Sequence, residues 1–196
     1  MLKAKYQKRD FSTERGKMGQ VDTNTLRYDK NHVTWKDKDG NDYCYETNNI
    51  YWAVARGENE ILIAKKNEEI TDYMVLLSDG REYLSYTRRC KDVSLKDEDT
   101  VCLSFQSSIE DLIVDNNGNI YFVAGSDIFF YRKKKKLLEK ICEIPEEYYF
   151  QRIEKLGNKY LSIICVPEHR EKYGFRDCRL GMELNNKKLV DLGIAY

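Results

Sequence analysis

The sequence predicts an all-β protein built from about four β-meander repeats of about 39 residues each. The first observation is a Gly-x-x-Tyr pattern whose glycines follow one another at intervals of 40, 38 and 39 residues. The second is that each glycine lies between two apolar, β-favouring runs, where a hairpin turn would fall. The third is that no segment is long and 3.6-periodic enough for a major helix. The recurrences are Gly40/Tyr43, Gly80/Tyr83, Gly118/Tyr121 and Gly157/Tyr160.

The clearest repeat lies in residues 109–144. Ile109–Val114 is predicted as a strand, Asp115–Gly118 as a tight turn and Asn119–Ala124 as the returning strand. Two further strands are predicted at Ile128–Tyr131 and Leu137–Cys142. Together these strands form an up-and-down meander.

The same order of strands and turns recurs on both sides of this repeat. Residues 148–192 repeat it downstream and residues 74–105 repeat it upstream. The position of the first repeat is ambiguous, because Ile50-Tyr51-Trp52 matches Ile120-Tyr121-Phe122 as well as the segment around Tyr43 does. We interpret residues 26–196 as a single β-repeat domain. Residues 1–25 are polar and are predicted either as an N-terminal arm or as an edge strand.

The pattern of strand, Asp-x-x-Gly-Asn and strand at Asp115–Asn119 resembles the blades of β-propellers, in the style of NHL-type repeats. The resemblance covers residues 28–193 in repeat length and turn placement. It implies a small or incomplete β-propeller that presents loops at a shared face, and it transfers no catalytic residue. The alternative is a two-sheet β-sandwich in which the period is coincidental.

Charge and hydropathy narrow the class of partner. Lysine plus arginine and aspartate plus glutamate both number 33, so the net charge is zero and nucleic acid is an unfavoured partner. The N-terminus carries no apolar signal region, and no stretch approaches the length of a membrane span. These features predict a cytoplasmic protein without a membrane contact.

Six cysteines in such a chain are predicted to be reduced core residues rather than a disulfide framework. Two pairs, Cys90/Cys102 and Cys165/Cys178, each bracket a polar loop and are candidates to face each other across a hairpin.

No pattern in the sequence predicts a catalytic residue, a metal site or a cofactor. The only histidines are His32 and His169, and neither has the spacing of a zinc site or of a nucleophile and base pair. The turns at Asp37–Asn41 and Asp115–Asn119 begin like calcium loops, but the glycine is at the wrong position and the closing glutamate is missing. They are interpreted as Asx-type turns, and an enzyme is the less favoured reading.

Two polar loops are the candidate partner-binding segments. The first is a cationic run that we interpret as a solvated hairpin tip, whose target would be a nucleotide or an acidic protein surface. The second is a charged loop that follows Pro167. The candidate residues are Arg132, Lys133, Lys134, Lys135 and Lys136 in the first loop, and His169, Arg170 and Tyr173 in the second.

The function predicted from these observations is a non-catalytic protein-binding module, compatible with a small bacterial or phage inhibitor or immunity-type factor. Open sheet edges would also allow a homodimer. The alternative is a small-ligand or nucleotide binder, or an enzyme, that uses the central pocket of the repeats. Its polar groups would come from Asp111, Glu110, Arg152 and Glu154.

Overall fold

The computed structural model describes residues 20–56, 60–67, 70–87, 90–96, 100–115, 117–174 and 176–195. Most of the predicted N-terminal arm therefore lies outside the described residues, and its last residues, from Val21, belong to the first strand. Among the described residues, no helix has the length and apolar character needed to cross a bilayer.

The chain forms four antiparallel sheets, and within each sheet the strands pair in sequence order. Sheet 1 contains β1 (Val21–Tyr28), β2 (His32–Asp37) and β3 (Asp42–Glu46). Sheet 2 contains β4 (Ile50–Arg56), β5 (Glu60–Asn67), β6 (Ile70–Leu77), β7 (Glu82–Thr87), β8 (Asp92–Lys96) and β9 (Thr100–Ser104). Sheet 3 contains β10 (Ile109–Val114), β11 (Ile120–Ala124), β12 (Asp127–Arg132) and β13 (Leu137–Glu143). Sheet 4 contains β14 (Tyr148–Leu156), β15 (Tyr160–Pro167), β16 (Cys178–Glu183) and β17 (Leu189–Ile194).

Two short 3₁₀ turns complete the secondary structure of the described residues. They are η1 (Lys133–Lys135), between β12 and β13, and η2 (Arg170–Tyr173), between β15 and β16. The prediction of an all-β class is confirmed.

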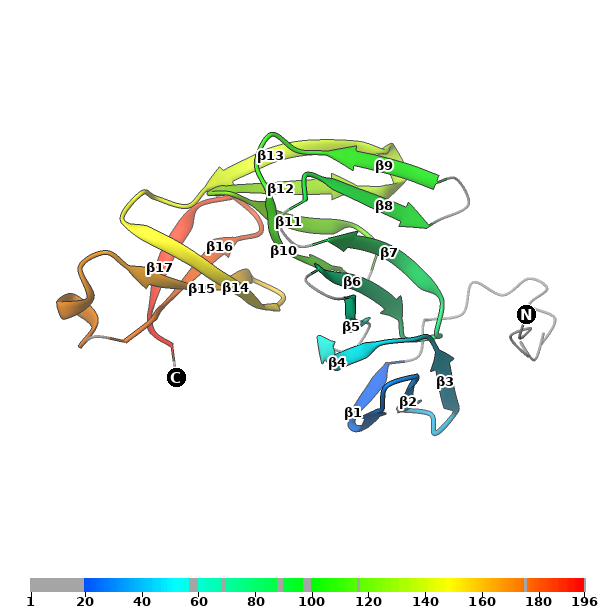
Figure 1. Cartoon of the computed structure of the whole chain (residues 1–196). Coiled ribbons are helices and arrows are strands. Elements are labelled where there is room, and N and C mark those ends of the chain that lie inside the picture. The colour runs from blue at the N-terminus through cyan, green and yellow to red at the C-terminus, as the bar shows by residue number, and fades with distance from the viewer. Residues whose placement is uncertain are drawn as a thin grey trace.

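The sheets pack face to face in the order in which the chain makes them. One hydrophobic core lies between sheets 1 and 2, a second between sheets 2 and 3, and a third between sheets 3 and 4. Figure 1 shows the result as a row of sheets that turns from β1–β3 at one end to β14–β17 at the other. Among the described residues, no hydrophobic cluster joins sheet 4 back to sheet 1.

The two middle sheets are buried on both faces, which explains their continuous apolar runs. In β5, Ile61 and Ile63 face the core shared with sheet 1, whereas Leu62 between them faces the core shared with sheet 3. In β11, Phe122 and Tyr121 divide between two cores in the same way. In such strands, successive side chains point alternately into two different cores, rather than into one core and into solvent.

The pairing follows the predicted meanders in the second half of the chain and departs from them in the first. Strands β10–β13 and β14–β17 each form a four-stranded sheet, but the earlier strands divide into sheets of three and six. The reason is the long hairpin of β5 and β6, which pairs eight residues of each strand from Glu60/Leu77 to Asn67/Ile70 and carries sheet 2 across the expected boundary.

Three of the four repeated glycines occupy the same turn. Gly40, Gly80 and Gly118 have positive φ angles of 85°, 84° and 75°. The turns at Gly40 and Gly118 share their hydrogen bonds, because Asp37 N donates to Asn41 O at 3.0 Å and Asp115 N donates to Asn119 O at 2.8 Å. The fourth glycine differs: Gly157 N donates to Tyr160 O at 2.9 Å, and its φ is not positive.

Two of these turns, at Gly80 and Gly118, contact the tyrosine of the preceding repeat. The ring of Tyr43 lies 3.9 Å from the position that a Cβ would take on Gly80. The hydroxyl of Tyr83 donates to the carbonyl oxygen of Gly118. In these two cases, the Gly-x-x-Tyr pattern places the tyrosine of one repeat in contact with the glycine turn of the next.

Replacing Tyr83 with phenylalanine is expected to lower the free energy of unfolding by about 1–2 kcal/mol, because a buried carbonyl loses its donor. Urea unfolding followed by circular dichroism measures the change. Tyr149, with 60% of its surface exposed, provides the control, and Tyr149→Phe should leave the unfolding midpoint in place. Equal midpoints for both variants would contradict the role assigned to Tyr83.

Candidate functional site

The cysteines and histidines do not form a nucleophile and base pair in the described part of the chain. Cys165 and Cys178 lie directly opposite each other in β15 and β16, as the sequence suggested, and both are reduced and fully buried. Burial raises the pKa of Cys165 to about 12 and that of Cys178 to about 11, which suppresses their thiolates at neutral pH.

The other predicted cysteine pair does not face each other. Cys102 lies opposite Ser94, and Cys90 precedes strand β8. Both are exposed, as is Cys44, so the prediction that the cysteines are core residues is wrong for these three. They lie on edge strands or near strand ends, where the thiol is exposed to solvent.

The two turns that begin like calcium loops use their carboxylates internally. Both oxygens of Asp37 accept hydrogen bonds from Asn41, each at 2.8 Å, and Asp115 and Asn119 repeat these contacts at 2.8 Å. Within the described residues, no group of three or more His, Cys, Asp or Glu side chains is arranged to hold a metal ion.

A buried ion network joins three of the sheets. Arg56 at the end of β4 lies 2.9 Å from Glu60 on β5 and 2.7 Å from Asp111 on β10, counted from guanidinium nitrogen to carboxylate oxygen. Glu60 also accepts from Val114 N, and Asp111 accepts from Ile153 N on β14, both at 2.8 Å.

The charges of this network are all satisfied inside the protein. Burial opposes the charge on Arg56, but Glu60 and Asp111 outweigh it and raise the arginine pKa. Burial also raises the pKa of Glu60, whose side chain is only 1% exposed. A site so enclosed stabilises the junction of sheets 2, 3 and 4 and presents nothing to a ligand.

Two of the four polar groups proposed for a central pocket have partners elsewhere. Asp111 pairs with Arg56, and Glu154 pairs with Arg179 through two hydrogen bonds of 2.7 Å. The side chains of these two carboxylates are engaged in separate clusters, which the sequence alone does not reveal.

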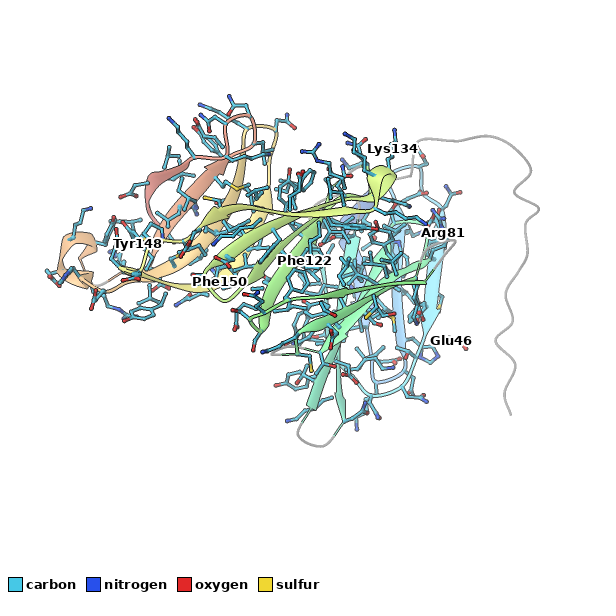
Figure 2. All side chains as sticks on the ribbon, turned by 90° about the horizontal axis from the view of Figure 1, so that it is seen from above. Glu46, Arg81, Phe122, Lys134, Tyr148 and Phe150 are labelled. Atoms are coloured by element: carbon cyan, nitrogen blue, oxygen red, sulfur yellow. The ribbon has the colours of Figure 1, made fainter. Side chains whose placement is uncertain are left out.

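The two predicted partner-binding loops lie on opposite sides of the molecule. In Figure 2, Lys134 in η1 lies on the same side of the molecule as Arg81, whereas Tyr148 lies at the far side. The hydroxyl of Tyr148 is 3.1 Å from that of Tyr173 in η2, so η2 belongs to that far side. The loops therefore form two separate surfaces.

In the second loop, only part of the predicted set faces solvent. His169 and Arg170 are exposed, and the ring of His169 lies 3.4 Å from the carboxylate of Glu171. Tyr173 is buried, and its hydroxyl donates to Asp191 at 2.6 Å. Tyr173 thus fastens the loop to sheet 4, and the part played by His169 and Arg170 in binding stays a prediction.

In the first loop, the five cationic residues divide between packing and exposure. The ammonium of Lys133 lies 5.3 Å from the centre of the Tyr83 ring, and its chain covers Gly118. Lys134, Lys135 and Lys136 are exposed. Within the described part of the chain, neither Lys134 nor Lys135 has a carboxylate at ion-pair distance.

A second turn adds positive charge beside this loop. The ring of Phe130 on β12 carries two cations, the guanidinium of Arg132 at 5.7 Å and the ammonium of Lys187 at 5.5 Å from its centre. Lys187 comes from the turn between β16 and β17 and donates to Leu184 O at 2.6 Å. Burial lowers the pKa of Lys187, and the charge of Arg132 lowers it further.

We call the residues Arg132–Lys136 and Lys187 the cationic surface. The carboxylate of Glu139 lies beside it and pairs with Arg132 at 2.9 Å. Sequence reasoning missed Lys187 because it is 51 positions from Lys136 and only the packing of sheet 4 against Phe130 brings the two turns together.

No protein-family model matches the chain, and none of the curated proteins matches it.

Proposed function

We propose that the protein is a non-catalytic binding module whose cationic surface recognises an acidic surface of another protein. The observation that carries the proposal is the pair of cations on Phe130. Burial lowers the pKa of Lys187 and repulsion from Arg132 lowers it further, while Glu139, which pairs with Arg132, offsets part of this effect. An anionic partner placed against these two cations relieves that repulsion. Its carboxylates should therefore bind more strongly here than at isolated lysines.

A protein partner is favoured over nucleic acid by the charge of the rest of the molecule. The net charge of the chain is zero, so a polyanion attracted to the cationic surface meets repulsion from the acidic residues elsewhere. A compact acidic patch on a folded protein avoids these residues.

An apolar contact lies next to the cations. Leu137 follows Lys136 directly, opens the edge strand β13 and has 42% of its surface exposed. Protein interfaces combine an apolar centre with charged groups at the rim, and Leu137 supplies such a centre here. Occlusion of a target by such a surface is the mode of action of an inhibitor or immunity-type factor, and we place the protein in that class.

We further propose that successive groups of four strands correspond to the blades of an incomplete propeller, although the first two groups are paired into sheets of three and six strands. Counted from β2 in groups of four strands, every repeated glycine lies between the first and second strands of its group. The contacts of Tyr43 with the next turn and of Tyr83 with the one after support this grouping. The open edges that such an array leaves keep the homodimer as a prediction.

The test uses charge reversal at the two most exposed lysines. The double variant Lys134→Glu/Lys135→Glu is expected to lose the proteins that the wild type captures from a lysate of the source organism. For the purified partner, affinity should fall at least about tenfold, and wild-type binding should weaken with added salt.

The matched control is Arg170→Glu on the opposite loop, which should bind as the wild type does. If the lysine variant captures the same proteins with the same affinity, the cationic surface is not the binding site. If Arg170→Glu alone loses them, the partner binds at the η2 loop instead.

A further inference from the structure

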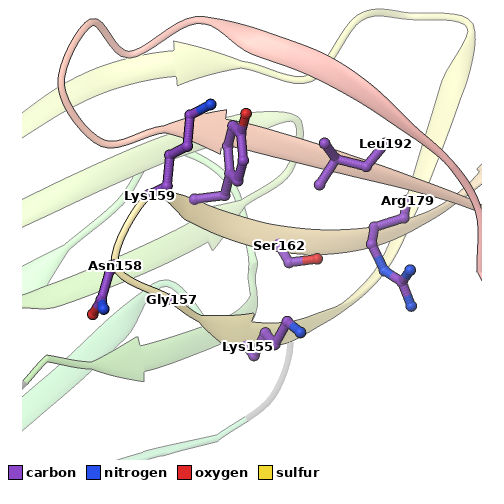
Figure 3. Close-up of a pocket in the computed structure, with 8 residues that line it drawn as sticks. Lys155, Gly157, Asn158, Lys159, Ser162, Arg179 and Leu192 are labelled. Atoms are coloured by element: carbon purple, nitrogen blue, oxygen red, sulfur yellow. The ribbon is translucent and has the colours of Figure 1, made fainter.

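A pocket opens on sheet 4. It has a volume of about 470 Å³ and is lined by residues from all four strands of the sheet and from the β14–β15 turn (Figure 3). The lining residues are Lys155, Gly157, Asn158, Lys159, Tyr160, Ser162, Arg179 and Leu192. Three of them are cations and none is a carboxylate.

The positive charge of the pocket is only partly balanced. Arg179 is held by Glu154, which also accepts from Ser162 at 2.8 Å, and these contacts lower the pKa of Glu154, Arg179 most of all. This pair is neutral in sum, so the charge of the site comes from Lys155 and Lys159. Lys155 is exposed and has no carboxylate at ion-pair distance in the described ranges.

One wall of the pocket is apolar and is fixed by a glycine. A Cβ on Gly181 would lie 2.7 Å from a methyl group of Leu192 and 3.1 Å from the ring of Tyr160. The absence of a side chain at this position therefore lets Leu192 and Tyr160 lie against the strand. The ammonium of Lys159 lies 4.8 Å from the centre of the Tyr160 ring, between the apolar wall and the charged part of the pocket.

We propose that this pocket binds a small organic phosphate that carries a planar ring. The ring lies against Tyr160 and Leu192, and the phosphate meets the ammonium groups of Lys155 and Lys159. Phosphate is favoured over a single carboxylate because its second negative charge matches the two lysine ammonium groups. The volume suits a ligand of this size, since small-molecule pockets begin at about 300 Å³.

The test is titration of the full chain with adenosine 5′-monophosphate, phenyl phosphate, adenosine and inorganic phosphate, followed by amide and methyl chemical shifts. The two organic phosphates are expected to shift the signals of Ser162 and Leu192 and to bind with dissociation constants of about 1 mM or tighter. Adenosine and inorganic phosphate each supply half of the recognition and should bind at least about tenfold more weakly.

Two variants separate this site from the cationic surface. Lys155→Glu/Lys159→Glu should weaken phenyl phosphate binding at least about tenfold, because repulsion replaces attraction at both ammonium positions. Lys134→Glu/Lys135→Glu should bind it unchanged, so the pocket and the proposed protein interface can fail independently. Organic phosphates that leave Ser162 and Leu192 unmoved, or that bind both variants equally, would overturn the proposal.

Discussion

Replacing Arg56 with methionine is expected to lower the free energy of unfolding by about 3–5 kcal/mol, the usual cost of removing one partner from a buried ion pair. The substitution leaves Glu60, 1% exposed, and Asp111, 14% exposed, without their cation. The carbonyl oxygen of Leu112 also loses the guanidinium donor. Urea denaturation followed by circular dichroism measures the loss.

The surface pair of Arg81 and Asp79 provides the control for Arg56. These side chains approach to 2.7 Å, but that of Arg81 is 63% exposed, so Arg81→Met should cost no more than about 1 kcal/mol. Arg56→Lys keeps the charge but not the planar fork and should fall between the two. A loss for Arg56→Met no larger than that for Arg81→Met would show that the network does not hold the sheets together.

Replacing Trp35 with alanine is expected to cost about 3–5 kcal/mol, because it removes a large side chain from a closed core. Trp35 is 2% exposed, stacks on Tyr43 at 5.4 Å between ring centres and lies 3.7 Å from the position of a Cβ on Gly80. Its indole nitrogen donates to Ser78 O at 3.0 Å, so the ring bridges sheets 1 and 2.

Two further variants divide this cost. Trp35→Phe keeps most of the packing and loses the hydrogen bond, so it should cost about 1–2 kcal/mol. Tyr51→Ala removes a ring that is 62% exposed and should shift the unfolding midpoint little. If Trp35→Ala unfolds at the same urea concentration as Tyr51→Ala, sheet 1 does not depend on this contact.

The sequence was sufficient for the class and for the turns, because both depend on local chemistry. Alternating and continuous apolar runs gave the strands, and Asp-x-x-Gly-Asn gave the turn at Gly118 with its positive φ. The grouping of strands into sheets of three and six was not predictable, since the choice between pairing β4 with β3 or with β5 is made by packing over the whole of β5 and β6.

In the candidate sites too, the sequence predicts the local features and does not predict those that depend on long-range packing. The cationic run at Arg132–Lys136 is visible in the sequence, whereas the approach of Lys187 to Phe130 depends on how two sheets face each other. The partners of Glu60 and Asp111 lie 54 and 42 positions away, at Val114 N and Ile153 N, and no periodic pattern encodes such distances. Tyr173 looked like a surface aromatic in a charged loop, yet it is buried beneath that loop.

Because the three cores form a row, the inner sheets pack against neighbours on both faces and the outer sheets on one face. Among the described residues, sheets 2 and 3 each share a core with a neighbour on both sides, whereas sheets 1 and 4 share a core with one neighbour. In such linear arrays, cooperativity passes only between adjacent units, so the ends fray first while the middle persists. We therefore expect sheet 4, which carries both Lys187 and the pocket lined by Tyr160 and Leu192, to open at a lower energetic cost than the centre. A ligand that binds there and bridges to sheet 3 is then expected to stabilise the whole row.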